Sequence, residues 1–198
     1  MRAFATLLLA AAFGPASAAV VNFDTYSPRY FFEDTTIVTD GFSFTSTCKC
    51  MGVDDQRPLA LDLTPLPGAY NGTASLIYST DPLTIAADGG GAFFLDQFDL
   101  GLSWYVPDAD VGRIATVAYA LAGGGTGSLD VALGRSYSTV TVGQDVLSVT
   151  ISGGRTFGYV SLDNLVVNNR VPEPASVGLA LLALCSAGLA TRRRHPGA

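Results

Sequence analysis

The residues best suited to catalysis are unevenly distributed along this chain. The only histidine, His195, lies beyond the last apolar run, so residues 1–194 contain none. Ser-His-Asp and Cys-His catalysis and most zinc sites need a histidine. Asp54 with Asp55, and Asp96 with Asp99, are only nominal carboxylate pairs for glycoside hydrolysis, since pairs arise freely among so many aspartates. The sequence therefore indicates a protein that is not an enzyme.

Aromatic side chains are the second group of candidate functional residues. They could bind a carbohydrate, because their faces can stack on sugar rings. Trp104, the only tryptophan, and the adjacent Tyr105 are the candidates for stacking. Packing of Trp104 in the core is the alternative. Further aromatic residues that would serve if exposed are Tyr26, Tyr30, Phe31, Tyr70 and Tyr78.

Cys48 and Cys50 are the only cysteines outside the apolar run near the C-terminus, which contains Cys185. An oxidising environment would favour a disulfide between Cys48 and Cys50. Residues two apart on an extended strand are separated by roughly 6.5 to 7 Å, so this disulfide requires a tight turn. A strained disulfide, a free thiol pair and metal binding by the two thiols all remain open.

The elements that must position these residues are strands. Short apolar runs separated by Gly, Asp, Asn or Pro fill residues 20–169, and helical periodicity is nearly absent. We expect an all-β fold, an antiparallel β-sandwich. Arg57–Gly72 is expected as a long irregular connection, and Asn71-Gly72-Thr73, which matches a glycosylation sequon, as a hairpin turn. The expected strands are Ala19–Phe23, Thr36–Thr45, Ala74–Tyr78, Leu83–Ala86, Phe93–Tyr105, Ile114–Ala122, Leu129–Leu133, Val146–Ile151 and Phe157–Val167.

The segment Leu162-Asp163-Asn164-Leu165-Val166-Val167 resembles the final strand of jelly-roll domains in some carbohydrate-binding modules. Their opening strand often carries a Phe-Asp pair, here Phe23-Asp24. In many jelly rolls the first and last strands pair side by side. Asp24 and Asp163 would then meet and, with backbone carbonyls, bind a structural calcium ion. The alternative is that Asp163 and Asn164 make a turn or hydrogen bonds at a strand edge. No other cofactor is expected.

Both ends of the chain carry export features. Residues 1–18 combine Arg2, an apolar stretch and the small residues Ala16-Ser17-Ala18, which is typical of a signal peptide cut by signal peptidase. Residues 19–170 are then the β-sandwich domain. Residues 171–194 follow this domain. They contain an apolar run that we expect to form a single transmembrane helix over about 175–191, and residues 195–198 are a tail.

The C-terminal residues have a specific order. Pro172, Glu173 and Pro174 come first, the apolar run follows, and Arg192, Arg193 and Arg194 form a basic stop that favours the cytoplasmic side. This order resembles the PEP-CTERM sorting signal of Gram-negative bacteria. The resemblance implies an exosortase as the processing partner, an inner-membrane intermediate and a final place at the cell surface or in the extracellular matrix.

The charge of the chain limits its partners. Between Asp24 and Glu173, seventeen acidic residues accompany seven basic ones, a net charge of about −10. Such a domain repels nucleic acid. We expect an exported, exosortase-sorted surface or matrix protein whose non-catalytic β-sandwich associates with exopolysaccharide or biofilm. A carbohydrate-binding, lectin-like module is the alternative, and a glycoside hydrolase is a more distant one.

Overall fold

The computed structural model describes residues 19–25, 35–47, 51–55, 68–79, 82–103, 110–153 and 159–168. They belong to a compact unit that spans residues 18–169. Within these residues, no helix has the length and apolar character needed to cross a membrane. The strands are β1 (Ala19–Val21), β2 (Thr36–Thr39), β3 (Phe42–Thr45), β4 (Met51–Asp54), β5 (Ser75–Tyr78), β6 (Leu83–Ala87), β7 (Phe93–Leu102), β8 (Ile114–Leu121), β9 (Thr126–Ala132), β10 (Ser138–Ser152) and β11 (Val160–Val167).

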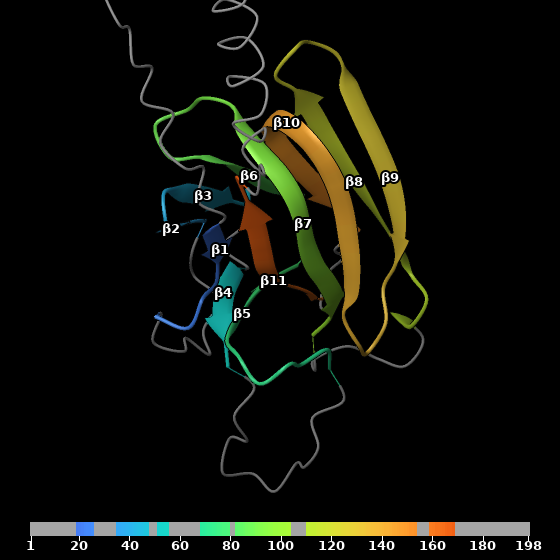
Figure 1. The fold of residues 1–198 in the computed structure, drawn as a ribbon. Coiled ribbons are helices and arrows are strands. Elements are labelled where there is room, and N and C mark those ends of the chain that lie inside the picture. Colours follow the sequence, from blue (N-terminus) through green and yellow to red (C-terminus); the bar gives the residue numbers. More distant parts are fainter. Residues whose placement is uncertain are drawn as a thin grey trace, which may run out of the picture. The chain divides into compact units, whose positions relative to one another are not determined.

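One long strand, β10, belongs to two layers (Figure 1). Its first half pairs with β7, and the layer continues through β11 and β5 to β4. Its second half pairs with β6 on one side, followed by β3 and β2, and with β8 on the other, followed by β9. A register shift between Thr141 and Gln144 marks a bulge, which bends β10 between the two layers. The fold is an antiparallel, jelly-roll-like β-sandwich, as predicted.

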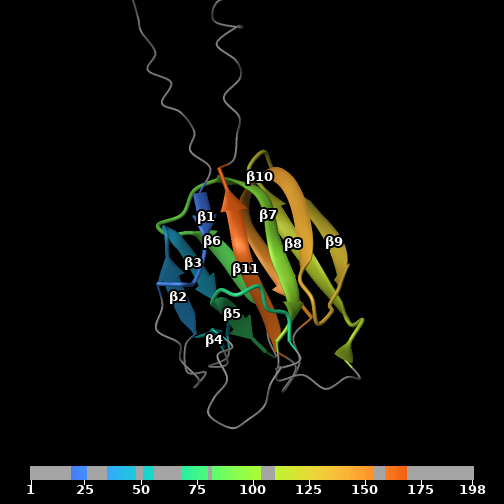
Figure 2. The same ribbon diagram turned by 60° about the horizontal axis from the view of Figure 1, so that its bottom comes forward.

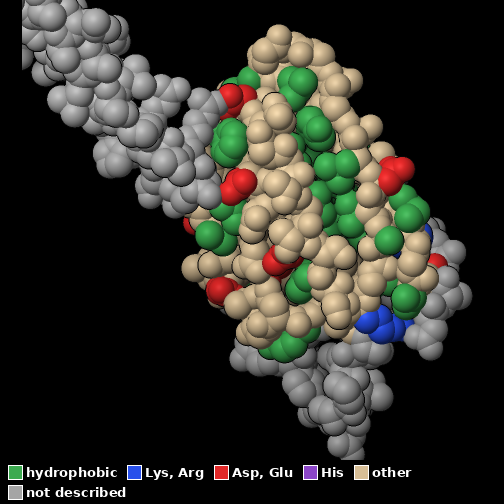
Figure 3. Space-filling view, turned by 45° about the vertical axis from the view of Figure 1, so that its right-hand side comes forward, with side chains coloured by type: hydrophobic (Ala, Val, Ile, Leu, Met, Phe, Trp, Pro, Cys, Tyr) green, Lys and Arg blue, Asp and Glu red, His purple; other side chains and the backbone are tan. Residues whose placement is uncertain are grey.

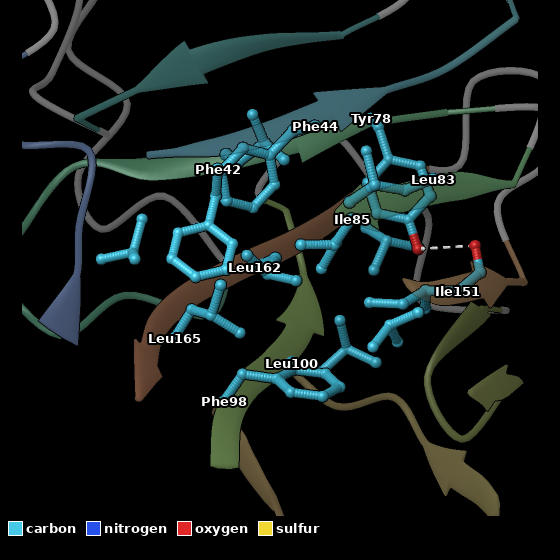
Figure 4. Packing of buried hydrophobic residues seen from close by; sticks show 14 of the residues in the cluster. Phe42, Phe44, Tyr78, Leu83, Ile85, Phe98, Leu100, Ile151, Leu162 and Leu165 are labelled. Carbon is cyan, nitrogen blue, oxygen red and sulfur yellow. Dashed lines mark hydrogen bonds between the residues drawn. The ribbon is translucent and has the colours of Figure 1, made fainter. Parts of the chain in front are cut away.

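The core lies between the layers. Phe42 and Phe44 of β3 face β7 and β11 across it, and Figure 4 shows Leu83 and Ile85 of β6 on the same side. The Tyr78 hydroxyl donates to the carbonyl oxygen of Ile151 at 3.4 Å inside this cluster. Burial raises the pKa of Tyr78 far above its ordinary value, so its hydroxyl stays neutral. The structure therefore places this tyrosine in the core, where it cannot stack on a sugar.

Besides shifted strand ends, such as β9 starting at Thr126 instead of Leu129, three differences separate the expected strands from the observed ones. Thr36–Thr45 is a hairpin, β2 and β3, because Asp40 and Gly41 both have positive φ, 50° and 78°, which suits a two-residue turn. The short β4 was not expected, since Gly52 and Asp54 interrupt its apolar pattern. The first half of β10 was also missed, because its threonines and Gly143 lower the apolar content.

Candidate binding face

A bulge in β11 turns two consecutive polar side chains to the same side. Leu162 and Leu165 both point into the core, although they are three residues apart. Asn164 has a φ of 49°, and the pairing with β7 shifts between Asp163 and Val166. The extra residue places the side chains of Asp163 and Asn164 together on the outer face of the layer, away from the core.

Asp99 of β7 lies directly opposite Asp163 across the strand pair. Two carboxylates in such a position repel each other, unless other groups compensate their charge. Asn164 Nδ2 donates to Asp99 Oδ2 at 2.9 Å, and Thr139 Oγ1 donates to Asp99 Oδ1 at 2.7 Å. Neutral donors thus hold both oxygens of Asp99.

Asp163 is held in the same way by different residues. Asn71 Nδ2 and Thr73 Oγ1 donate to its Oδ2 at 2.9 and 2.8 Å, and the backbone N–H of Asn164 donates to its Oδ1 at 2.8 Å. Asp163 is fully buried. Burial raises the pKa of this carboxyl, the three hydrogen bonds lower it, and the nearby Asp24 raises it again, with a net upward shift.

The residues that cover Asp163 come from the segment before β5, which Figure 2 shows crossing the face of β11 towards β7. Ala69 lies so close above Gly101 of β7 that any larger residue at position 101 would collide with it. Asn71 Oδ1 accepts the backbone N–H of Thr73 at 3.1 Å, which makes an Asx turn, and Gly72 has a φ of 99°. The predicted hairpin turn at this place is therefore wrong, because no strand directly precedes this turn.

A chain of hydroxyl groups supports the neighbouring part of the same outer face. Tyr137 OH and Ser161 Oγ are hydrogen bonded at 2.7 Å, and Ser161 Oγ donates to Ser75 Oγ at 2.9 Å. Burial is the main cause that raises the pKa of Tyr137 to about 12. The tyrosine therefore stays neutral at physiological pH and acts as a hydrogen-bonding spacer.

Together these side chains form one hydrogen-bonded cluster on the outer side of the layer, with Asp163 buried beneath the others. We call it the polar face and define it by Asn71, Thr73, Asp99, Thr139, Asp163 and Asn164. Tyr70 lies in the chain between Ala69, which covers Gly101, and Asn71, which bonds Asp163. About half of its surface, 49 %, is exposed. It is the only aromatic residue among the exposed large hydrophobic side chains of the described segments.

The first and last strands pair, and Asp24 lies near enough to Asp163 for its charge to raise the pKa of that carboxyl. β1 pairs antiparallel with β11, with Val21 opposite Leu165, and Asp24 follows β1. Asp24 Oδ1 accepts the backbone N–H of Ala74 at 2.9 Å, and its charge acts on Asp163. The described residues contain no group of three or more His, Cys, Asp or Glu side chains that could hold a metal ion. Calcium binding at Asp24 and Asp163 stays a prediction.

Several predicted residues lie outside the described part of the chain. They are Tyr26, Tyr30, Phe31, Trp104, Tyr105, Cys48, Cys50, the Pro172-Glu173-Pro174 motif, Arg192–Arg194, the signal peptide and the transmembrane helix. Conversely, sequence reasoning did not combine Tyr70, Asn71, Thr139 and Asn164 into a site. The Asn-Gly-Thr turn was the available signal, because Asx turns often place a polar side chain in a fixed position.

Comparison with known families identifies one segment. Residues 170–194 match the PEP-CTERM protein-sorting motif, which contains Pro172, Glu173 and Pro174. No curated protein matches the chain.

Among solved structures, the chain is similar to a family 29 carbohydrate-binding module mutant complexed with cellulohexaose. The TM-score is 0.42 at 10 % identity, over 78 % of this chain and 92 % of the module. It is also similar to a module named TmCBM61 in complex with β-1,4-galactotriose, with a TM-score of 0.40 at 10 % identity, over 65 % and 88 % of the two chains. A third is the K1 cleaved adhesin domain of Lys-gingipain from Porphyromonas gingivalis W83, with a TM-score of 0.45 at 12 % identity, over 76 % and 97 %.

Proposed function

We propose that this protein is exported, is sorted by an exosortase to the cell surface or extracellular matrix, and binds a polysaccharide there without cleaving it. The sorting motif at residues 170–194 supports the first part. The second part rests on Tyr70, an exposed aromatic residue directly before Asn71, whose side chain belongs to a group of amide, hydroxyl and carboxylate groups.

The chemistry of a polysaccharide fits this combination. Sugar rings have apolar C–H faces that stack on aromatic rings, and their hydroxyl groups both donate and accept hydrogen bonds. Thr139 and Asn71 are exposed, whereas Asp99 and Asn164 are half-buried, so these groups are accessible from solvent. The side chains hold one another through hydrogen bonds, so little rotamer entropy is lost when a ligand binds.

The same geometry argues against hydrolysis by the two carboxylates that face each other. A glycosidase needs its acid and its nucleophile or base on either side of an accessible scissile bond. Asp163 has no exposed surface and is covered by Asn71 and Thr73. A sugar chain therefore cannot reach between Asp163 and Asp99, and we assign the face to binding.

Binding is tested with the full chain in mild detergent, by retardation in gels that contain defined soluble polysaccharides. We expect Tyr70→Ala to weaken retardation by about two- to tenfold, because a stacked aromatic ring contributes roughly 0.5 to 1.5 kcal/mol. Tyr70→Phe keeps the ring and should keep most of the binding. Val38→Ala changes an exposed apolar residue on β2 and serves as the control.

Equal retardation of Tyr70→Ala and the unmodified chain would contradict stacking at Tyr70. Absence of retardation by any neutral or charged polysaccharide would overturn the binding function itself. Release of reducing ends during incubation would contradict the non-catalytic assignment.

Calcium at Asp24 and Asp163 remains a separate proposal, supported by the proximity of the two carboxylates. A bound calcium ion would raise the melting temperature, since it binds the folded state alone. A melting temperature that is unchanged between millimolar calcium and excess chelator would remove this proposal.

A further inference from the structure

Strand β9 is an open edge of the sandwich. Among the described strands it pairs only with β8. It is seven residues long, whereas the other edge strands β1, β2 and β4 have three or four residues. Short length, proline, lysine and bulges commonly protect edge strands from pairing with other chains. β9 has no proline, no lysine and no register shift.

The backbone groups of β9 point alternately to β8 and to the open side. Leu121 N–H donates to Gly125 O at 3.0 Å, and Leu133 N–H donates to Arg113 O at 2.8 Å, at the two ends of the β8–β9 pair. In an antiparallel pair, every second residue directs both of its backbone groups to the same neighbour. The odd-numbered residues of β9 therefore bond to β8. The even-numbered ones, Thr126, Ser128, Asp130 and Ala132, direct their N–H and C=O groups to the open side.

The side chains along this edge continue the core without closing it. Leu129 and Val131 of β9 pack against the buried cluster but remain half-exposed, as do Tyr119 and Leu121 of β8. The ring of Tyr119 lies against Gly127 and covers it. Figure 3, in which this side of the molecule comes forward, shows hydrophobic side chains in a band along it. A further strand beside β9 would bury more of this apolar surface.

We propose that β9 pairs antiparallel with β9 of a second copy of this chain, around a twofold axis through Leu129. In this register Ser128 lies opposite the partner's Asp130, and Thr126 lies opposite the partner's Ala132. All seven residues of each strand are paired, with about eight new backbone hydrogen bonds. The layer that contains β9 in one copy and the same layer of the second copy then form one continuous sheet.

The charge pattern selects this register. Asp130 is the only charged residue of β9. An axis through Asp130 would set two carboxylates opposite each other, which is unfavourable. An axis through Ser128 would leave part of each strand without a partner. With the axis at Leu129, each Asp130 faces a hydroxyl donor, while its Oδ1 accepts Thr116 Oγ1 at 2.7 Å. The strand is thus complementary to itself, which is what a twofold interface requires.

The test measures the mass of the full chain in mild detergent by sedimentation velocity over a range of concentrations. A reductant is present, so that intermolecular disulfides do not contribute to the measured mass. We expect a monomer–dimer equilibrium. Ser128→Asp should raise the dissociation constant about tenfold or more, because the dyad puts two like-charged pairs directly opposite each other. Adding Asp130→Lys to Ser128→Asp should restore the dimer, because each introduced carboxylate then faces an introduced ammonium group.

Thr45→Asp is the matched control, because Thr45 is exposed on β3 and lies on another part of the sheet. It should leave the dissociation constant unchanged. A chain that is monomeric at all concentrations would overturn the proposal, as would a different segment of the same chain seated on β9. A dimer that Ser128→Asp does not weaken, or that the second change does not restore, would overturn the proposed register. Circular dichroism and melting of each variant report whether the fold is retained.

Discussion

Strands β11 and β9 have similar lengths, eight and seven residues, but opposite surroundings. β11 is buried on both faces: leucine and valine side chains fill the core, while Ser161 and Asp163 lie beneath Tyr137 and the segment before β5. β9 has one exposed face and one half-buried face, and its far edge is open among the described strands. β11 is irregular, with a bulge at Asn164, whereas β9 is regular.

The difference shows how the same element serves two purposes. A strand in the middle of a layer can carry a bulge, because neighbours on both sides hold it, and the bulge presents two polar side chains to one surface. A regular edge strand presents instead a repeating row of backbone groups, which suits another strand. The polar face and the open edge are therefore separate surfaces with different chemistry.

The largest effect should come from the core of β11. Leu162→Ala removes a fully buried side chain and should lower the free energy of unfolding by about 2 to 5 kcal/mol. Leu129→Ala makes the same chemical change on the half-exposed β9 and should cost about 1 kcal/mol. Urea unfolding at low protein concentration, where the proposed dimer is dissociated, measures both. Equal losses would contradict the contrast between the two strands.

A smaller effect concerns pH and the outer face of β11. Burial raises the pKa of Asp163 above the value of about 3.9 for an unperturbed aspartate. Between these two values the folded state binds more protons than the unfolded state, so the contribution of Asp163 to stability falls as pH rises. This contribution is fully present below the unfolded pKa and is lost as pH rises through the folded pKa.

Asparagine cannot ionise, so Asp163→Asn should remove the fall in stability that the carboxyl causes as pH rises. Melting temperatures from pH 3.5 to 7 for this variant and for the unmodified chain give the two slopes. Asp88→Asn, the same change in an exposed turn, is the control. Parallel profiles for Asp163→Asn and the unmodified chain would show that the buried carboxyl does not titrate as we infer.

The sequence predicted much of the fold, and the reasons differ between elements. Short apolar runs separated by Gly, Asp, Asn or Pro predicted β5, β6, β7 and β8. The Asp-Gly turn within Thr36–Thr45 was overlooked, although such a turn is a strong hairpin signal. The first half of β10 depends on pairing with β7, which local composition does not express.

The candidate site was predicted only in part. The pairing of the first and last strands brought Asp24 and Asp163 together, as the Phe-Asp and Leu-Asp-Asn patterns indicated. The contribution of Asn71 and Thr73 depends on a segment about ninety residues away in sequence, which no local pattern places over β11. Asn164 reaches Asp99 only because the bulge turns it outward.

By itself, the sequence determined the sorting motif at residues 170–194, the all-β character of the domain and its negative charge. These properties depend on residue type and near neighbours, so they can be read along the chain. The tertiary structure alone decided which polar side chains share the outer face of β11 and which strand is left at the edge. Both depend on strand order, register and a single bulge, since shifting a strand by one residue turns each side chain to the opposite face.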